Sequence, residues 1–180
     1  MIKVVFAHSF NENGKAFGCQ NGLPWPHLKE DMEMFQESTR HSVVVMGMKT
    51  WESLPKRLPG RVNVVMGKYL PDNKAGEAPD MLMHGDLYQA LTDLTLNYPE
   101  KNICVIGGLA LIEEALEFCH QVDMTVIYPS DQKGFDADIY MSNQTIDRIH
   151  SEFTTVLKHE IRLAKGPVDS IVRKVMKRKC

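Results

Sequence analysis

The stretch PHLKEDMEMF places a carboxylate where a soluble protein would bury apolar side chains. A helix turns about 100° per residue, so with Leu28 at 0° the side chains of Met32 and Phe35 fall at about 40° and −20°. Asp31 falls at about −60°, between Phe35 and Met34, whereas the neighbouring glutamates lie on the opposite, solvated face. A carboxylate in apolar surroundings costs several kcal/mol unless a partner or a proton neutralises it. Asp31 therefore needs an explanation.

Two interpretations of Asp31 follow from the helix. In the first, the side chain lies at the edge of the face and reaches water or a nearby cation, as most carboxylates do. In the second, it lies in a pocket and binds a ligand that carries N–H donors. The helix alone favours the first interpretation and leaves both open.

Glycine joins a predicted strand to a predicted helix at two further places. In IGGLAL, Gly107 and Gly108 allow a tight turn and the approach of a phosphate to helix N–H groups. In MGMKTWESL, Gly47 permits the turn, and Lys49 and Thr50 stand at the helix start, where an anion is favoured. The alternatives are a plain turn and a threonine cap beside a solvated lysine. Two such junctions in one sheet suggest a dinucleotide with its pyrophosphate between them.

Four more residues at or next to turns are candidates for ligand contacts. Arg61 follows the Pro-Gly turn of RLPGRVNVVM and is either a bidentate carboxylate clamp or a surface arginine. Gly67 and Lys68 follow a predicted strand at its carboxyl end, where ligands bind in open α/β sheets. Trp25, in NGLPW, has an indole N–H that needs a partner whether the ring belongs to a core or to a site.

Alternating strands and helices must position these residues. The candidate strands are Ile2–Ala7, Ser42–Met46, Val62–Met66, Ile103–Ile106, Val122–Tyr128, Glu152–His159 and Ser170–Met176. The candidate helices are Leu28–Ser38, Met48–Leu54, Leu87–Asn97 and Ala110–Phe118. This alternation predicts a mostly parallel α/β sheet of about eight strands with helices on both faces. The turn signal Lys165-Gly166-Pro167 predicts a C-terminal antiparallel hairpin at a sheet edge. The polar segments Ser9–Gly22 and Lys68–Asp80 are expected to be functional loops.

Composition limits the classes of function. The 180 residues suit one domain, 1–180, and 21 basic against 23 acidic side chains indicate no general affinity for nucleic acid or membrane. The apolar N-terminal run is too short for a signal peptide, so we expect a cytoplasmic protein. No spacing of histidines or cysteines indicates a metal site. The four cysteines are expected to be reduced thiols: Cys19, Cys104, Cys119 and Cys180. The basic C-terminal segment RKVMKRKC is interpreted as a solvated strand edge and tail.

The order of the motifs resembles the dihydrofolate reductase family. The series is NGLPW, an acid seven residues after its proline with Phe four residues later, MGxKTWESL, LPGR, and VIGG after a strand. The matches run from the first strand to about Tyr140 and are densest in 21–66. The resemblance implies NADPH-dependent reduction of 7,8-dihydrofolate to 5,6,7,8-tetrahydrofolate for one-carbon metabolism and thymidylate synthesis. Hydride would pass from C4 of the nicotinamide to C6 of the pterin, with protonation at N5.

The resemblance assigns roles to the residues of the substrate site. It implies that Asp31 accepts hydrogen bonds from the 2-amino group and ring N–H of the pterin. Trp25 matches a tryptophan that orders a water near this acid, and Thr125 matches a threonine that hydrogen-bonds it. Arg61 matches the arginine that grips the α-carboxylate of the glutamate tail. The other implied substrate contacts are Val5, Ala7, Met32, Phe35, Leu54 and Ile106. We expect water to protonate N5, while Asp31 orients the ring and raises its basicity.

The resemblance also implies an NADPH site. The segment Asn13–Leu23 matches the mobile loop that closes over the nicotinamide. The implied cofactor contacts are Ala7, Phe17, Gly18, Gly47, Lys49, Thr50, Gly67, Lys68, Ile106, Gly107 and Gly108.

Three positions near the cofactor phosphates depart from the family pattern. Met48 stands where many members have a basic residue, Gly67 where a serine is common, and Ala110 where some bacterial members have arginine. These replacements remove polar contacts to phosphate. Lys49 and Lys68 remain as the expected phosphate partners of NADPH.

Dihydrofolate and antifolates such as methotrexate are the implied small-molecule partners, and a monomer is expected. Two other functions remain open. One is a reductase of the same architecture that acts on a pyrimidine riboside; that substrate has no glutamate tail, so Asp31 together with Arg61 favours folate. The other is a non-catalytic nucleotide-binding or structural protein, which would not consume NADPH.

Overall fold

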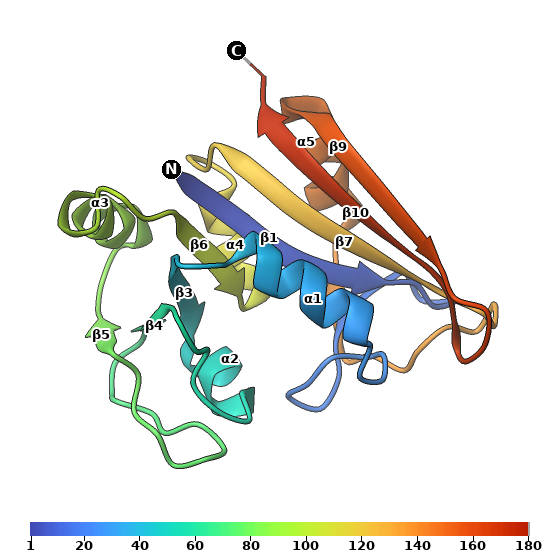
Figure 1. Ribbon diagram of the computed structural model, residues 1–180, viewed down its shortest axis with the longest axis horizontal. Helices are drawn as coiled ribbons and strands as arrows, with labels where there is room; N and C mark the ends of the chain where they lie inside the picture. Colours follow the sequence, from blue (N-terminus) through green and yellow to red (C-terminus); the bar gives the residue numbers. More distant parts are fainter. Residues whose placement is uncertain (180) are drawn as a thin grey trace. The chain divides into compact units, whose positions relative to one another are not determined.

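A computed structural model describes residues 1–179 and has α/β architecture (Figure 1). Its strands are β1 (Ile2–Ser9), β2 (Lys15–Gly18), β3 (Val43–Gly47), β4 (Val62–Met66), β5 (Met81–Met83), β6 (Ile103–Gly107), β7 (Gln121–Pro129), β8 (Ile139–Met141), β9 (Phe153–Arg162) and β10 (Val168–Arg178). Its helices are α1 (Lys29–Ser38), α2 (Met48–Ser53), α3 (Leu87–Asn97), α4 (Leu109–Ala115) and α5 (Asn143–Glu152).

Eight of the strands form one sheet, in the order β5-β4-β3-β6-β1-β7-β10-β9, and β2 pairs with β8 in a separate two-stranded sheet. Strands β5, β4, β3, β6 and β1 pair in parallel, whereas β10 is antiparallel to both β7 and β9. The prediction of a mostly parallel sheet that ends in an antiparallel hairpin is therefore confirmed. The chain divides into two compact units. Unit 1 comprises Met1–Val5 and Ser38–His120, and unit 2 comprises Phe6–Glu37 and the chain from Gln121 onward.

Unit 1 is built on parallel strands whose side chains are buried. Val43 to Met46 of β3 have no exposed surface, as expected of a strand that is covered on both faces. Helix α3 begins at Asp86, whose side chain accepts a hydrogen bond from Gln89 N over 2.9 Å. It buries side chains spaced at intervals of three and four residues, namely Leu87, Ala90, Leu91 and Leu94.

Unit 2 combines antiparallel strands with α1 and α5. An apolar cluster of Trp25, Met34, Ile127, Val168 and Ile171 joins α1 and the turn before it to β7 and β10. Strand β9 lies at the sheet edge and exposes most of its side chains, which is typical of an edge strand.

The seven predicted strands and four predicted helices are present; two match the predicted ranges and the ends of the others differ by at most three residues. Strands β2, β5 and β8 are three or four residues long and were not predicted. Segment Ser9–Gly22, expected as a loop, therefore contains a strand. Helix α5 was also missed, although Ser142 caps it by accepting from Thr145 N over 3.0 Å, and Ile146 and Ile149 form its buried face. The helix contains only two large apolar residues, although their spacing of three residues and the Ser142 cap are typical of a helix.

The interpretation of RKVMKRKC as a solvated strand edge is wrong. Strand β10 lies between β7 and β9, because the hairpin turns back into the sheet, and β9 forms the edge. Arg173 is consequently buried, with only 9% of its surface exposed. Cys180, one of the four cysteines predicted to be thiols, lies outside the described residues.

The longest helix of residues 1–179, α3, has eleven residues, and no helix in this part of the chain has the length and hydrophobicity to cross a bilayer.

Candidate active site

Asp31 is a buried carboxylate in the first turn of α1, in unit 2. Only 6% of its surface is exposed, so the interpretation of Asp31 as an edge residue that reaches water is wrong. Trp25 Nε1 donates a hydrogen bond to Asp31 Oδ2 over 3.1 Å. The rigid turn before α1 therefore supplies a partner that is itself buried in the apolar cluster.

The surroundings of Asp31 change its acidity. Burial raises the pKa of the carboxyl above its ordinary value of 3.8, and the Trp25 hydrogen bond and the charge of His27 lower it by less. A carboxylate removed from water gains most from a ligand that brings N–H donors, because each donor replaces lost hydration. The site is therefore suited to a planar ligand edge with an amino group and a ring N–H.

The face of α1 matches the predicted angles. Met34 is buried in the apolar cluster, whereas Phe35 and Met32 are half-buried and follow Asp31 on its other side around the helix. Glu33 is exposed on the opposite face. The two half-buried side chains provide apolar surface beside the carboxylate, as a ring-shaped ligand requires.

Other residues predicted for the site also belong to unit 2. Ala7, on β1, packs against the cluster that contains Trp25. Thr125 is buried on β7, and its predicted hydrogen bond to the acid stays a prediction. Phe17 is half-buried, and at Gly18 a Cβ atom would lie 3.2 Å from Ile139 Cδ1, so β2 and β8 leave little room for a side chain there. Asp31, Trp25 and Ala7 are thus grouped at the α1 end of unit 2.

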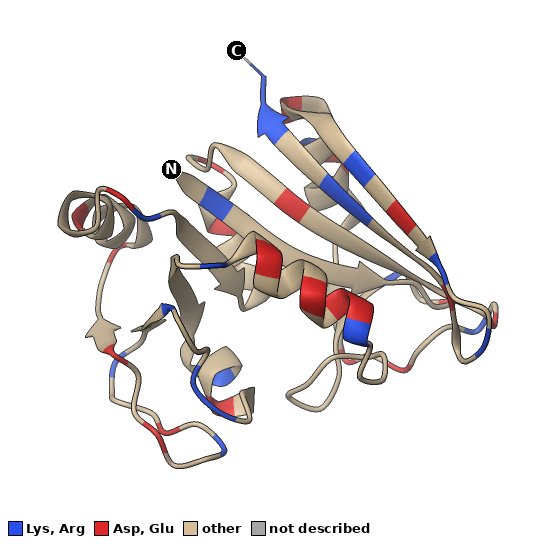
Figure 2. Cartoon of the chain, viewed as in Figure 1, with Lys and Arg blue, Asp and Glu red and all other residues tan. Residues whose placement is uncertain are grey.

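A buried ion pair in the same unit escaped the sequence analysis. Arg173 Nη1 donates to Glu37 Oε2 of α1 over 2.8 Å, and Nη2 donates to Asp123 Oδ2 of β7 over 3.3 Å. Acidic residues mark α1 and basic ones mark the second half of β10 (Figure 2). Charged residues in a C-terminal strand read as solvated, so no local signal indicated that Arg173 links α1 to the sheet.

The two glycine junctions lie side by side in unit 1. Strands β3 and β6 are parallel neighbours, and Met46 is opposite Gly107 in their register. Gly107 has φ +147°, and a Cβ atom there would lie 3.0 Å from Thr50 Oγ1. At Gly47 a Cβ atom would lie 3.6 Å from the Gly108 nitrogen. Gly47, Thr50, Gly107 and Gly108 are therefore packed closely together where two strands lead into helices, a position that fits a phosphate-bearing cofactor.

Two departures from the family pattern turn out to be coupled. A Cβ atom on Gly67 would lie 2.2 Å from Met48 Sδ, so the Met48 side chain occupies the space that a larger residue at position 67 would need. Lys49 and Lys68 are exposed and remain available to a phosphate group in solution. The other predicted residues of unit 1 are buried Val5 and half-buried Leu54 and Ile106.

Arg61 follows the turn that precedes β4, and its guanidinium is oriented by three acceptors. Nε donates to the Thr39 carbonyl over 3.1 Å and to Thr39 Oγ1 over 3.0 Å. Nη1 donates to the Pro59 carbonyl over 3.1 Å. The half-buried side chain is therefore held in one direction, as a clamp for an anionic group requires.

Comparison with known proteins gives the family of the chain. The family model for dihydrofolate reductase matches residues 1–166. Dihydrofolate reductase type A10 of Escherichia coli is 34% identical over 173 residues, which cover 94% of this chain and 87% of the relative. Dihydrofolate reductase type 9 of the same organism is 31% identical over 157 residues, 85% of each chain. A solved dihydrofolate reductase from Enterococcus faecalis, complexed with NADP(H) and RAB-propyl, shares the fold with a TM-score of 0.76 and 22% identity, covering 100% of this chain and 97% of that one.

Proposed function

Because the chain belongs to the dihydrofolate reductase family, we propose that it reduces 7,8-dihydrofolate to 5,6,7,8-tetrahydrofolate with NADPH as reductant. The observation that carries this proposal is the buried Asp31 carboxylate, whose single charge lies among apolar side chains next to the Trp25 indole. A pterin has the 2-amino and ring N–H groups that such a carboxylate needs.

Asp31 orients the substrate in this proposal. Its two oxygens accept from the amino end of the pterin, and Met32 and Phe35 contact the ring and the benzoyl group. The negative charge of Asp31 also raises the basicity of the pterin ring, which favours proton uptake at N5 from water. Thr125 and Trp25 hold the carboxylate in the correct direction.

The glycine junctions of unit 1 hold the cofactor in this proposal. Gly47, Gly107 and Gly108 present backbone N–H groups to the phosphates, and Thr50 adds a hydroxyl. NADPH, when bound, supplies the hydride that reduces C6 of the pterin. Lys49 and Lys68 provide the positive charge that favours NADPH over NADH.

Other contacts complete the assignment. Arg61 binds the α-carboxylate of the glutamate tail, and Val5, Ala7, Leu54 and Ile106 line the substrate site. On the cofactor side, Ala7, Phe17, Gly18, Gly67 and Ile106 contact NADPH. The proposal also covers a single domain over 1–180, a monomeric state, a cytoplasmic location and inhibition by methotrexate.

A direct assay tests the function. Purified protein is mixed with NADPH and dihydrofolate, and the absorbance of reduced nicotinamide is followed with and without methotrexate. We expect NADPH consumption that methotrexate abolishes. A parallel reaction with a pyrimidine-riboside substrate is the control for a related reductase. The proposed function fails if dihydrofolate gives no consumption, or if only the riboside does.

A further inference from the structure

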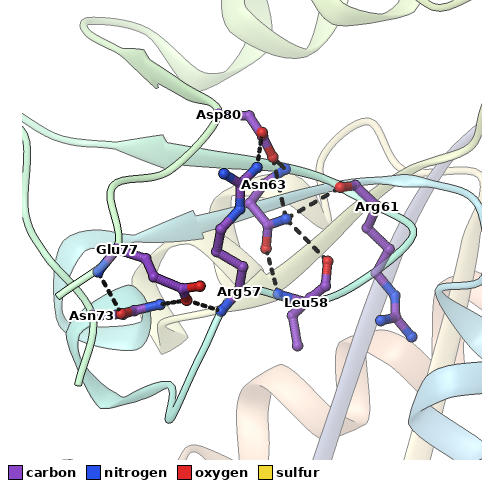
Figure 3. Close-up of polar contacts among 7 residues, drawn as sticks. All are labelled: Arg57, Leu58, Arg61, Asn63, Asn73, Glu77 and Asp80. Atoms are coloured by element: carbon purple, nitrogen blue, oxygen red, sulfur yellow. Dashed lines mark hydrogen bonds and ion pairs between the residues drawn. The ribbon is translucent and has the colours of Figure 1, made fainter. Parts of the chain in front are cut away.

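The turn that carries Arg61 is joined to a distant carboxylate in unit 1. Figure 3 shows Asn63 at the centre of this network, with Asp80 on one side and the turn residues on the other. Asn63 is almost completely buried, with 1% of its surface exposed. Its side chain accepts from Leu58 N over 3.0 Å and donates to the carbonyls of Leu58 and Arg61 over 3.1 and 3.2 Å. One amide therefore closes the turn on both sides.

Asp80 orients that amide from the far end of the segment Lys68–Asp80. Asp80 Oδ2 accepts from the Asn63 backbone nitrogen over 2.7 Å and from Asn63 Nδ2 over 3.3 Å. The Asp80 nitrogen donates to the Asn63 carbonyl over 2.9 Å, and the second carboxylate oxygen is ion-paired with Arg57. Partial burial raises the pKa of Asp80, but these hydrogen bonds and Arg57 outweigh it and hold the pKa below its ordinary value. Asp80 is thus charged at neutral pH and fixed by groups on both sides of the turn.

The rest of the segment reinforces the same connection. Glu77 accepts from the Arg57 nitrogen over 2.7 Å and from Asn73 Nδ2 over 2.9 Å. Lys74 N donates to the Leu54 carbonyl over 3.1 Å. The long polar segment is therefore tied to the stretch that runs from the end of α2 to Arg61.

We infer that Asp80 is a positioning residue for recognition of the glutamate tail: acting through Asn63, it fixes the Leu58–Arg61 turn so that Arg61 meets the α-carboxylate of the substrate. The inference rests on the proposed function, because it concerns the substrate of that site. Arg61 is bound to the turn by Pro59 and to Thr39 outside it, so a shift of the turn moves the guanidinium relative to its anchor. Bidentate recognition of a carboxylate tolerates little displacement. Asp80 touches neither the pterin nor the cofactor in this scheme.

The experiment compares two substrates that differ only in the tail: 7,8-dihydrofolate and 7,8-dihydropteroate, which lacks glutamate. Asp80→Ala removes both the acceptor and the charge. We expect its KM for dihydrofolate to rise about tenfold, the loss of one charge-assisted contact, with kcat changed less than about twofold. Its KM for dihydropteroate should stay within about twofold of the unmodified protein, because dihydropteroate ends in a benzoate carboxylate and lacks the α-carboxylate that Arg61 is proposed to bind.

Matched controls separate positioning from folding. Asp93→Ala removes an equal charge from α3 of the same unit, where Asp93 accepts from Gln89 over 2.8 Å, and should leave both KM values unchanged. Asp80→Asn keeps an acceptor for Asn63 but loses the ion pair with Arg57, so its KM for dihydrofolate should rise by about threefold. If Asp80→Ala does not fold, as judged by circular dichroism, Asp80→Asn carries the test.

Three results would overturn the inference. Equal changes of KM for the two substrates would mean a general structural role. No change for either would mean that the turn does not depend on Asp80. A lower KM for dihydrofolate would mean that Asp80 withholds Arg57 from the substrate. If the unmodified protein reduces neither substrate, the proposed function itself fails, and this outcome is distinct from the other three.

Discussion

Replacing Asp31 with asparagine removes the one charge on the buried face of α1 and preserves the size of the side chain. The Asn oxygen can still accept from Trp25 Nε1, the partner at 3.1 Å. The substitution therefore tests how the buried charge affects stability and activity, without a change in packing.

The variant should gain stability and lose activity. Relief of an incompletely compensated buried carboxylate should stabilise the ligand-free protein by about 1 kcal/mol, within the range of single stabilising changes. For a chain of this size that corresponds to a rise in Tm of about 2–4 °C. Turnover at pH 7 should fall at least about 100-fold, because the pterin loses its anchor and the charge that favours protonation.

The pH dependence has a definite sign. Burial raises the pKa of Asp31 above 3.8, so the folded state keeps its proton at pH values where the unfolded chain has lost it. The stability that Asp31 contributes in its protonated form is therefore lost as pH rises above 3.8. At neutral pH the buried carboxylate is charged and its full destabilising effect is present. The advantage of Asp31→Asn should be largest at neutral pH and should shrink as the pH falls towards 3.8. Turnover of the variant should recover in part in acid, where solvent protonates the substrate.

Thermal melts of the ligand-free proteins from neutral to acid pH test the predicted gain of stability. Steady-state rates over the same pH range test the predicted loss of activity. Normal turnover of Asp31→Asn at pH 7 would refute the catalytic role. A lower Tm at neutral pH would refute the conclusion that the buried charge is a cost to the fold.

Three further predictions concern unit 2. Trp25→Phe removes a hydrogen bond that lowers the pKa of Asp31, so the acid limb of the kcat/KM profile should move to higher pH; an unmoved limb would contradict the role of the indole. Asp123→Leu should lower the free energy of unfolding in urea by about 3–5 kcal/mol, because it leaves Arg173 buried and charged. The double variant Asp123→Leu, Arg173→Leu should recover most of this stability. Equal losses in the single and double variants would argue against a stabilising ion pair. Burial lowers the pKa of His8 from 6.5 to about 4, so the free energy of unfolding should fall by roughly 3 kcal/mol as pH falls from 6.5 to 4. The variant His8→Phe keeps the ring packing with Phe10 and should flatten that fall. A parallel decline in both proteins would refute the role of His8.

Local patterns were sufficient for most of the fold. The strands and helices of the parallel part have strong apolar periodicity, so Val62–Met66 and Leu87–Asn97 were predicted to the residue. The strands β2, β5 and β8 were missed because three or four residues contain too little periodicity to distinguish a strand from a loop.

The candidate site likewise has features that local sequence predicts and features that depend on tertiary packing. The angle of Asp31 on its helix and the glycines after two strands are local features, so the sequence by itself determined that an acid is misplaced and that two turns can receive phosphate. It could not decide whether Asp31 reaches water, because that depends on what packs against α1; the tertiary structure decided it by burying the acid beside Trp25.

The tertiary structure alone decided the supporting contacts. Asp80 lies 17 residues from Asn63, and Asp123 lies 50 residues from Arg173. Such pairs form only when the strand order and the register bring distant segments together, and side-chain periodicity within one segment contains no record of either. The sequence thus determined which residues have the chemistry for the proposed folate site, whereas the sheet decided which distant charged residues contact their supporting segments.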